Sequence, residues 1–372
     1  MERRKTKTVK IGPVKVGGNS LISVQSMTKT ATEDVTGTVR QIHRLEKLGC
    51  EIIRVAVRDT ASACAVRKIK AKINIPLVAD IHFNYRLGLQ AIDCGADGLR
   101  LNPGNIYRHE EIKAVIASAK KRKIPIRVGV NSGSLTAIRK SASSGKSVPR
   151  EARTADLSGR MARFALDYIK ILEEMDFYDI VVSLKASDVA ETVQAYKKLA
   201  AVCSYPLHLG ITAAGLPQYG MIKSAVGIGS LLLEGIGDTI RVSLTGDPEE
   251  EVTAARNILQ SLGIRNFTPE IIACPTCGRT QANIVGIVEE LTKKLGHREF
   301  AVNRPLKIAV MGCEVNGPGE AKEADLGIAA GKGCGLLFRK GKVVEKIKEE
   351  NFVRRLLLEI EKSGYITGRP AR

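Results

Sequence analysis

The 372-residue chain contains no tryptophan, and aromatic residues make up only 4% of it. No apolar run is long enough to cross a bilayer, so we expect no membrane partner. Eight cysteines in a chain of this length do not indicate a disulfide scaffold. The opening MERRKTKTVKIG is basic but lacks the apolar segment of a secretory signal. These features together predict a cytoplasmic protein.

Basic residues outnumber acidic ones by 58 to 39, which gives a formal net charge of +19. Such a balance favours anionic partners: nucleic acid, a membrane surface or a small phosphorylated ligand. We expect no nucleic acid, because aromatic residues are few and no RNA-binding motif or zinc-finger spacing occurs. A solvated surface accounts for lysines scattered along helices. The positions of the arginines are therefore more informative than their number.

Short apolar runs alternate with amphipathic segments along the first 264 residues. In chain order the runs read SLISVQS, EIIRVAV, IPLVADIHF, DGLRLNPG, IPIRVGVN, YDIVVSLKAS, YPLHLGIT and DTIRVSLT. Their high content of Val, Ile and Leu is typical of parallel strands covered on both faces. Eight strand–helix units of this length predict a TIM barrel over residues 1–264. A doubly wound open sheet is disfavoured, because no G-x-G-x-x-G follows the first run.

The pattern changes after Gly263, where a short polar linker leads into IIACPTCGRT. A helical pattern, an apolar strand pattern and the glycine-rich GCEVNGPGE follow. We predict a second, smaller α/β domain over residues 265–372, a plausible size for one. The long connection 132–153 within the first domain carries five basic residues, and it is either a binding loop or a flexible insertion.

Several predicted strands carry a cation among apolar residues. These cations are Arg54, Arg100, Arg127, Lys185 and Arg241. A charge in a buried strand is unfavourable unless it is paired, and the active sites of TIM barrels lie at the carboxyl ends of the strands. Five such cations indicate a polyanionic ligand such as a diphosphate, rather than five internal ion pairs.

Polar residues at other strand ends extend this predicted site. Asn102 and Asn131 end two of the same strands and offer further hydrogen-bond donors. Asp80 and His82 in VADIHF form a candidate acid–base pair. The alternative for this pair is a structural role, in which the two side chains orient each other inside the core.

The cysteines of the second domain predict an inorganic centre. Cys274 and Cys277 form a C-x-x-C pair, and Cys313 follows in the glycine-rich segment. Thiolates suit both zinc and iron–sulfur clusters, so the spacing alone does not choose between them. The fourth ligand is either Cys334 or Glu320. Zinc would prefer a second closely spaced pair, which is absent.

The whole chain resembles the 4-hydroxy-3-methylbut-2-enyl diphosphate synthases of the non-mevalonate isoprenoid pathway, in their two-domain bacterial form. The likeness rests on VQSMT, HLGIT, EGIGDTIRVSL, ACPTCGR and NGPGE. It implies a TIM barrel joined to a [4Fe-4S] domain. The implied reaction is a two-electron reductive ring opening of 2-C-methyl-D-erythritol 2,4-cyclodiphosphate, with loss of water. The resemblance also implies a head-to-tail homodimer and an electron donor that is a ferredoxin or a flavodoxin.

The resemblance assigns roles residue by residue. The implied cluster ligands are Cys274, Cys277, Cys313 and Glu320, with Cys334 excluded, and Asn316 would lie beside the cluster near the reacting carbons. The positions that match the family's diphosphate-binding residues are Arg54, Arg100, Asn102, Arg127, Asn131, Lys185, Arg241 and Ser243.

One position departs from the family pattern. Where the family reads T-E-A-G after the seventh strand, this chain has Thr212-Ala213-Ala214-Gly215. Alanine cannot transfer a proton, so we expect that step to fall to water, His82 or Asp80. Glu234 is a weaker substitute, because its position at a helix end favours a structural role. We expect reduced rather than absent activity.

Two competing hypotheses remain at the level of sequence. One is a zinc-stabilised TIM-barrel enzyme, a hydrolase or aldolase acting on a phosphorylated small molecule, whose cysteines are structural. The other is a basic nucleic-acid-binding protein. Iron and sulfide analysis of anaerobically purified protein separates the first from the iron–sulfur enzyme, and salt-dependent binding to DNA or RNA would indicate the second.

Overall fold

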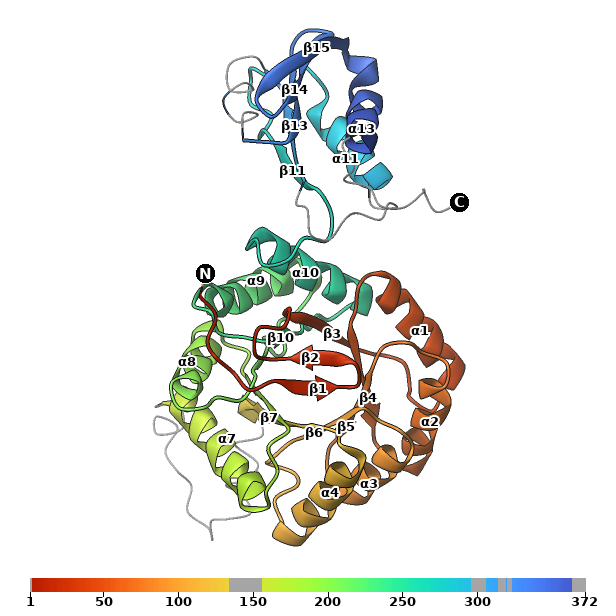
Figure 1. The fold of residues 1–372 in the computed structure, drawn as a ribbon, viewed down its shortest axis with the longest axis vertical. Helices are drawn as coiled ribbons and strands as arrows, with labels where there is room; N and C mark the ends of the chain where they lie inside the picture. Colours follow the sequence, from red (N-terminus) through yellow and green to blue (C-terminus); the bar gives the residue numbers. More distant parts are fainter. Residues whose placement is uncertain (1, 134–155, 296–305, 314–318, 320–322, 363–372) are drawn as a thin grey trace. The chain divides into compact units, whose positions relative to one another are not determined.

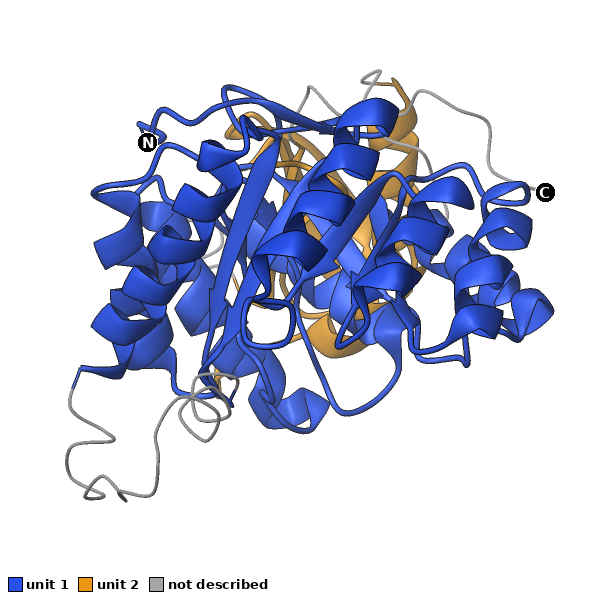
Figure 2. Cartoon of the chain, turned by 90° about the horizontal axis from the view of Figure 1, so that it is seen from below, with its two compact units in different colours: residues 1–264 blue, residues 265–372 orange. Residues whose placement is uncertain are grey.

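The computed structural model describes residues 2–133, 156–295, 306–313, 319 and 323–362. The chain divides into two compact units, residues 1–264 and 265–372 (Figure 2). The connection 132–153 falls almost wholly outside the described residues. No helix in the described ranges is long and apolar enough to span a membrane.

The first unit is the TIM barrel that the sequence predicts (Figure 1). Its parallel strands are β3 (Ser23–Met27), β4 (Ile52–Val57), β5 (Leu77–Ile81), β6 (Gly98–Leu101), β7 (Ile126–Asn131), β8 (Ile180–Lys185), β9 (His208–Leu209) and β10 (Thr239–Ile240). Their order is β8-β7-β6-β5-β4-β3-β10-β9. A parallel bridge between Val182 and Leu207 joins β8 to the segment before β9, so the sheet closes on itself.

Helices surround the barrel, as Figure 1 shows. They are α1 (Val35–Lys47), α2 (Thr60–Lys70), α3 (Tyr85–Asp93), α4 (His109–Arg122), α7 (Leu157–Glu174), α8 (Val189–Ala200), α9 (Pro217–Leu233) and α10 (Pro248–Ser261). Short polar side chains start several of them. Asp59, for example, accepts a hydrogen bond from the Ser62 amide in a capping box that begins α2. Such caps define where these helices begin.

The barrel differs from the sequence prediction in two places. The last two strands hold two residues each, fewer than their apolar runs suggest, because the chain leaves the ladder soon after His208–Leu209 and Thr239–Ile240. An antiparallel hairpin, β1 (Val9–Ile11) with β2 (Val14–Val16), was not predicted. Its apolar side chains pack on Ile52 and Val78, near the amino ends of β4 and β5. The hairpin therefore closes the end of the barrel opposite the predicted site.

The second unit is a mixed five-stranded sheet with helices. Its strands, in sheet order, are β11 (Glu270–Ala273), β12 (Lys307–Met311), β13 (Leu326–Ala330), β14 (Cys334–Arg339) and β15 (Lys342–Lys348). The first three run parallel and the last two antiparallel. Helices α11 (Ile284–Leu295) and α13 (Phe352–Lys362) pack on the sheet through a buried core that includes Leu291, Ile308 and Phe352. A short 3-10 helix, Glu349–Asn351, precedes α13.

Candidate active site

The five predicted cations lie in the interior of the barrel, from Arg127 near the amino end of β7 to Lys185 at the carboxyl end of β8. Arg54, Arg100, Arg127 and Lys185 lie on β4, β6, β7 and β8, and Arg241 directly follows β10. Three of these residues are buried, with exposed fractions of 5–7%: Arg100, Arg127 and Lys185. Burial, and after it repulsion by the other cations, lowers the pKa values of Arg127 and Lys185. The cations therefore lie close enough to interact, as the sequence predicts.

Asp80 is the first of two carboxylates that balance this charge. Its Oδ1 lies 3.2 Å from Arg100 Nη1, and its Oδ2 lies 3.5 Å from Arg54 Nε. Burial would raise the pKa of Asp80, but Arg54, Arg100 and the other neighbouring cations hold that pKa well below its usual range. Asp80 is therefore a counter-ion to Arg54 and Arg100, while its acid–base role stays a prediction.

Glu251 is the second carboxylate, and sequence reasoning missed it. It lies on α10, is 1% exposed, and approaches Arg241 Nη2 at 3.5 Å and Lys29 Nζ at 3.1 Å. The Leu244 amide also donates a hydrogen bond to Glu251 Oε1. The sequence did contain one signal for Glu251 in the PEEEVTAAR segment. Its neighbours Val252 and Ala255 mark the inner face of the helix, and Glu251 is the glutamate nearest to that face.

Two cations of the cluster lack a complete set of partners. Arg127 Nη1 donates to Gln25 Oε1, but its Nε and Nη2 have no hydrogen-bond acceptor among the described residues. Lys185 forms no ion pair within the described ranges. Burial lowers the pKa of Lys185 well below its ordinary value, and the neighbouring arginines lower it further. With Lys29, six basic side chains thus lie around the two carboxylates Asp80 and Glu251, an arrangement that favours an anionic ligand.

Glycines make room for two of these cations. A Cβ built on Gly129 would lie 2.4 Å from Arg100 Nε, and the Gly129 carbonyl accepts a hydrogen bond from Arg100 Nη2 at 2.9 Å. A Cβ on Gly210 would lie 2.5 Å from Lys185 Nζ. The backbone of β7 and the segment after β9 therefore form part of the surroundings of these cations, here called the cradle.

The predicted polar residues occupy the same end of the barrel. Asn102 directly follows β6, is buried, and accepts a hydrogen bond from the Gly104 amide, which fixes the turn. Asn131 ends β7, and half-buried Ser243 lies shortly after β10. His82 follows β5 with its Nε2 3.8 Å from Asp80 Oδ2, and its side chain is 44% exposed. His82 is thus the member of the pair that can exchange protons with solvent.

Ala213 lies in the loop after β9, where the family places its glutamate. The residue is exposed, and its φ of 50° is in the left-handed region that non-glycine residues seldom adopt. Glu234 ends α9 and pairs with Lys197 at 2.8 Å. The helix runs back from the carboxyl ends of the strands, so Glu234 lies at the other end of the barrel. This placement agrees with a structural role for Glu234, which stays a prediction.

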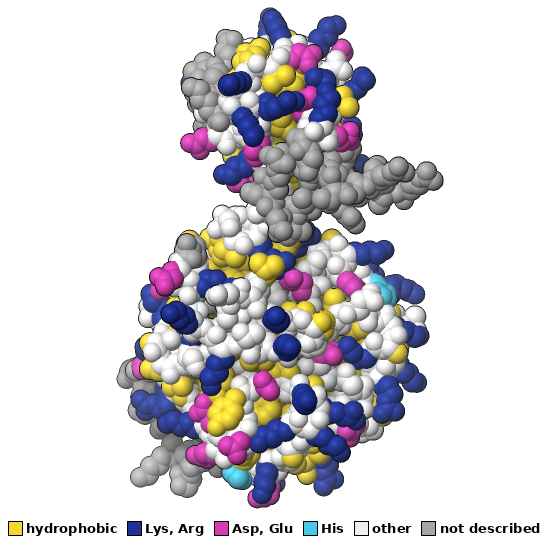
Figure 3. All heavy atoms as spheres, in the orientation of Figure 1, with side chains coloured by type: hydrophobic (Ala, Val, Ile, Leu, Met, Phe, Trp, Pro, Cys, Tyr) yellow, Lys and Arg dark blue, Asp and Glu magenta, His cyan; other side chains and the backbone are white. Residues whose placement is uncertain are grey.

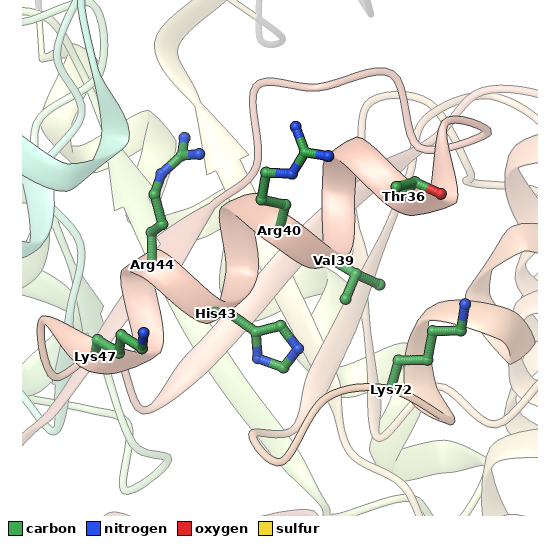
Figure 4. Close-up of a pocket in the computed structure, with 7 residues that line it drawn as sticks. All are labelled: Thr36, Val39, Arg40, His43, Arg44, Lys47 and Lys72. Carbon is green, nitrogen blue, oxygen red and sulfur yellow. The ribbon is translucent and has the colours of Figure 1, made fainter.

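A second basic cluster lies on the outer face of α1 and contrasts with the barrel interior. It surrounds a pocket of about 390 Å³ lined by Thr36, Val39, Arg40, His43, Arg44, Lys47 and Lys72. Figure 4 shows Arg40 and Arg44 extending from one side of the helix and His43 from another. The arginines and lysines are exposed, and Arg44 pairs with Glu249. Figure 3 shows many such solvated Lys and Arg side chains among acidic ones. Solvated charges need no ligand, whereas the buried ones do.

The cysteines of the second unit follow neighbouring parallel strands. Cys274 comes directly after β11, and Cys313 comes two residues after β12. The Gly312 amide donates a hydrogen bond to Cys274 Sγ at 3.1 Å, which suits a thiolate at this position. Cys277 is exposed beside Thr276, whose φ is 50°. The sheet therefore brings sulfur donors to one edge.

The complete ligand set cannot be traced in the described ranges. Within them, no three His, Cys, Asp or Glu side chains are gathered as a metal site. The predicted ligand Glu320 and the predicted neighbour Asn316 lie outside the described residues. Cys334 begins β14, beside the end of β13. The thiols that follow β11 and β12 are suitable ligands for an iron–sulfur group. The ligand roles of the individual residues stay predictions.

Three further cysteines are buried in the barrel. Cys50, Cys94 and Cys203 are 2%, 8% and 9% exposed and have free thiols. Burial raises the pKa of the Cys50 thiol to about 12. These cysteines act as small apolar side chains.

Two family models match nearly the whole chain. The GcpE TIM-barrel domain matches residues 6–256, and the GcpE protein C-terminal domain matches residues 270–362. Curated relatives carry the name 4-hydroxy-3-methylbut-2-en-1-yl diphosphate synthase (flavodoxin). The relative from Clostridium perfringens is 51% identical, covering 97% of this chain and 99% of its own length. Relatives from Dehalococcoides mccartyi and Geobacillus kaustophilus are 52% and 51% identical, covering 96% and 97% of this chain and 98% and 93% of their own lengths.

Proposed function

This chain belongs to the GcpE family, and we propose that its five barrel cations, three of them buried, bind the diphosphate of the family's substrate. The reaction is the reductive ring opening of 2-C-methyl-D-erythritol 2,4-cyclodiphosphate to 4-hydroxy-3-methylbut-2-enyl diphosphate in isoprenoid biosynthesis. Two electrons and two protons enter, a carbon–oxygen bond of the ring breaks, and one water leaves. The chain is therefore an oxidoreductase, and the zinc-enzyme alternative is not favoured.

The observation that carries the binding proposal is the uncompensated charge inside the barrel. Arg54, Arg100 and Arg241 share Asp80 and Glu251, while Arg127 and Lys185 have no carboxylate partner in the described ranges. Guanidinium groups bind phosphate oxygens through paired N–H donors, and buried charge pairs are stronger than solvated ones. Asn102, Asn131 and Ser243 would add hydrogen bonds at the same end of the barrel.

The GcpE family is generally iron–sulfur dependent. We infer a [4Fe-4S] cluster held by Cys274, Cys277, Cys313 and Glu320, with Asn316 beside it. When bound, this cluster supplies the reducing electrons. The support is the placement of Cys274 and Cys313 after adjacent parallel strands, together with the Gly312 amide that faces Cys274 Sγ. Carboxylate at the fourth position would exchange for a substrate oxygen more easily than thiolate.

Proton transfer in this chain falls to His82 or water, since Ala213 stands where the family has glutamate. Asp80 stays ionised between Arg54 and Arg100, so it orients cations rather than donating protons. His82 approaches Asp80 and remains 44% exposed, which gives its imidazole access to solvent protons. A half-exposed histidine is a less well placed acid than a glutamate on the loop after β9.

The partners follow from charge and from exposed apolar surface. A flavodoxin is the proposed donor, because the relatives' names include it and a basic protein attracts acidic carriers. A homodimer, head-to-tail, is proposed for assembly. Its support is a stripe of exposed apolar residues at the start of and along α9, each 53–65% exposed: Leu216, Tyr219, Ile222, Val226 and Leu233. Free buried thiols in the barrel favour the reducing cytoplasm as its compartment.

The binding proposal is tested by calorimetric titration of the protein with the cyclic diphosphate, without reductant. Arg100→Met should weaken binding about 10- to 100-fold, because a hydrogen bond to a charged group contributes roughly 1.5–3 kcal/mol. The matched control is Arg40→Met on the outer face of α1, which should leave the affinity unchanged. Equal affinities for both variants and the unaltered chain would contradict the proposed site.

A further inference from the structure

A small cavity lies inside the barrel below the cation cluster. Its volume is about 10 Å³, and its lining includes Arg127, His208, Gln25 and Thr239. The unpredicted hairpin closes it from below through Ile11. A cavity of about this volume holds one water molecule and no more. The remaining lining is largely apolar, so any bound water would depend on these polar side chains.

Two buried side chains at this cavity have unused hydrogen-bonding atoms. His208 is 0% exposed, and neither of its ring nitrogens has a partner among the described residues. Arg127 is 6% exposed, and its Nε and Nη2 likewise have no acceptor in that part of the chain. Buried polar atoms are rarely left unpaired in native proteins, and ordered water usually supplies the missing bond.

The donors and acceptors of these two residues are complementary through one water. A guanidinium only donates, whereas a neutral imidazole has one nitrogen that accepts. Burial lowers the pKa of His208 well below its ordinary value, and Lys185, Arg127, Arg54 and Arg241 lower it further, so the ring is neutral. A water molecule can accept from Arg127 and donate to the accepting ring nitrogen of His208, which gives each side chain one of its missing hydrogen bonds.

We propose that one ordered water occupies this cavity and that the His208–water–Arg127 link positions the Arg127 guanidinium for the diphosphate. Gln25 holds Nη1 on one side, and the water holds the other side of the same group. Such a restraint matters because Arg54 and Arg100 repel Arg127. His208 is therefore a positioning residue for binding. This inference rests on the proposed binding of the cyclic diphosphate by the barrel.

A crystal structure of the full chain at a resolution that shows ordered water tests the first half directly. The expected result is one water within hydrogen-bond distance of both a His208 ring nitrogen and an Arg127 nitrogen. A cavity without ordered density, or a direct bond between the two side chains, overturns the link. This measurement does not require any variant to fold.

Calorimetric titration with the cyclic diphosphate tests the positioning role. His208→Phe keeps a ring of similar size without an acceptor, and it should weaken binding about 10-fold. His208→Asn or His208→Gln should restore most of the affinity, and the one that does so identifies the accepting nitrogen. Unchanged affinity in His208→Phe, or no rescue by either amide, overturns the inference. Failure of the unaltered chain to bind the diphosphate would instead overturn the proposed function.

Discussion

At the scale of single residues, unpaired charges in the barrel interior lower folding stability and favour the binding of an anionic ligand. Lys185 is 7% exposed, and the described residues provide it with no carboxylate. Arg127 has two guanidinium nitrogens without acceptors in the same part of the chain. An unpaired buried charge destabilises a fold, so its retention indicates a ligand that neutralises it.

Lys185→Met should therefore change stability and binding in opposite directions. Removing the buried ammonium relieves its repulsion with the neighbouring arginines, so the thermal midpoint without ligand should rise by a few degrees. Affinity for the cyclic diphosphate should fall at least 10-fold. Calorimetry with and without ligand measures both quantities. A variant with lower stability and unchanged affinity would show that Lys185 is structural.

Asp80→Asn is the complementary change and should destabilise the unliganded protein by about 3–5 kcal/mol, because Arg54 and Arg100 lose their counter-ion. Denaturant unfolding measures the loss. The diphosphate should recover part of it by replacing the missing negative charge. Should the variant unfold at the same denaturant concentration as the unaltered chain, Asp80 would not be the counter-ion described here.

The buried His208 gives folding stability a defined pH dependence. Its folded-state pKa is depressed, so below about pH 6.5 the unfolded chain binds a proton that the folded chain does not. Stability is thus retained above that pH and lost as the pH falls, by up to about 1.4 kcal/mol per pH unit. Urea unfolding between pH 7 and pH 5 should show this loss, and His208→Phe should lack it. His109→Gln, on the exposed start of α4, serves as the control and should keep it.

Ala213→Glu should raise turnover by ~10²-fold or more, because it restores a general acid in the loop after β9. Ala213→Gln matches its size without the proton and should show no such gain. Steady-state assays of the loaded enzyme compare kcat for the two variants. If glutamate brings no increase over glutamine, another group already performs this step and the reduced-activity hypothesis is wrong.

At the scale of secondary-structure elements, apolar runs predict the barrel well because each strand is buried on both faces and reads as continuous Val, Ile and Leu. Strand β4, with the sequence IIRVAV, is an example. The hairpin β1–β2 escaped prediction since VKI and VKV are too short to show a period, and their pairing depends on packing against Ile52 and Val78. The local sequence pattern does not predict such tertiary contacts.

The site was predictable to a similar extent and for a similar reason. Cations on strands such as β6 and β8 stand out, because charge is rare within buried apolar runs. Their partners were less visible: Asp80 was left between an acid–base and a structural role, and Glu251 was not singled out in a helix whose first turn holds three glutamates. Which carboxylate is buried depends on the packing of α10, so the counter-ions emerge only from the fold.

Gly129 on β7 tests the cradle at the scale of one element. Gly129→Ala places a Cβ 2.4 Å from Arg100 Nε, so the guanidinium must move and lose its bond to the Gly129 carbonyl. We expect a folded protein whose affinity for the cyclic diphosphate is about 10-fold lower. Gly229→Ala on α9, where a Cβ meets nothing within 4 Å, is the control and should bind normally. Equal affinities would show that Arg100 does not need its present position.

At the scale of the whole molecule, the chain joins two units with different chemistry. The barrel gathers cations in its interior, which we propose bind the anionic substrate, and the second unit carries sulfur donors after β11 and β12. Relatives in the GcpE family share this order of domains along nearly their full length. The family reaction needs both parts, because the substrate must be held while electrons reach it.

The most direct test is an anaerobic assay of the iron-loaded full chain with reduced flavodoxin and 2-C-methyl-D-erythritol 2,4-cyclodiphosphate. We predict formation of 4-hydroxy-3-methylbut-2-enyl diphosphate, with two electrons consumed per molecule of product and activity lost in Cys313→Ser. An iron-loaded chain that binds the cyclic diphosphate but yields none of this product, with any reductant supplied, would contradict the account.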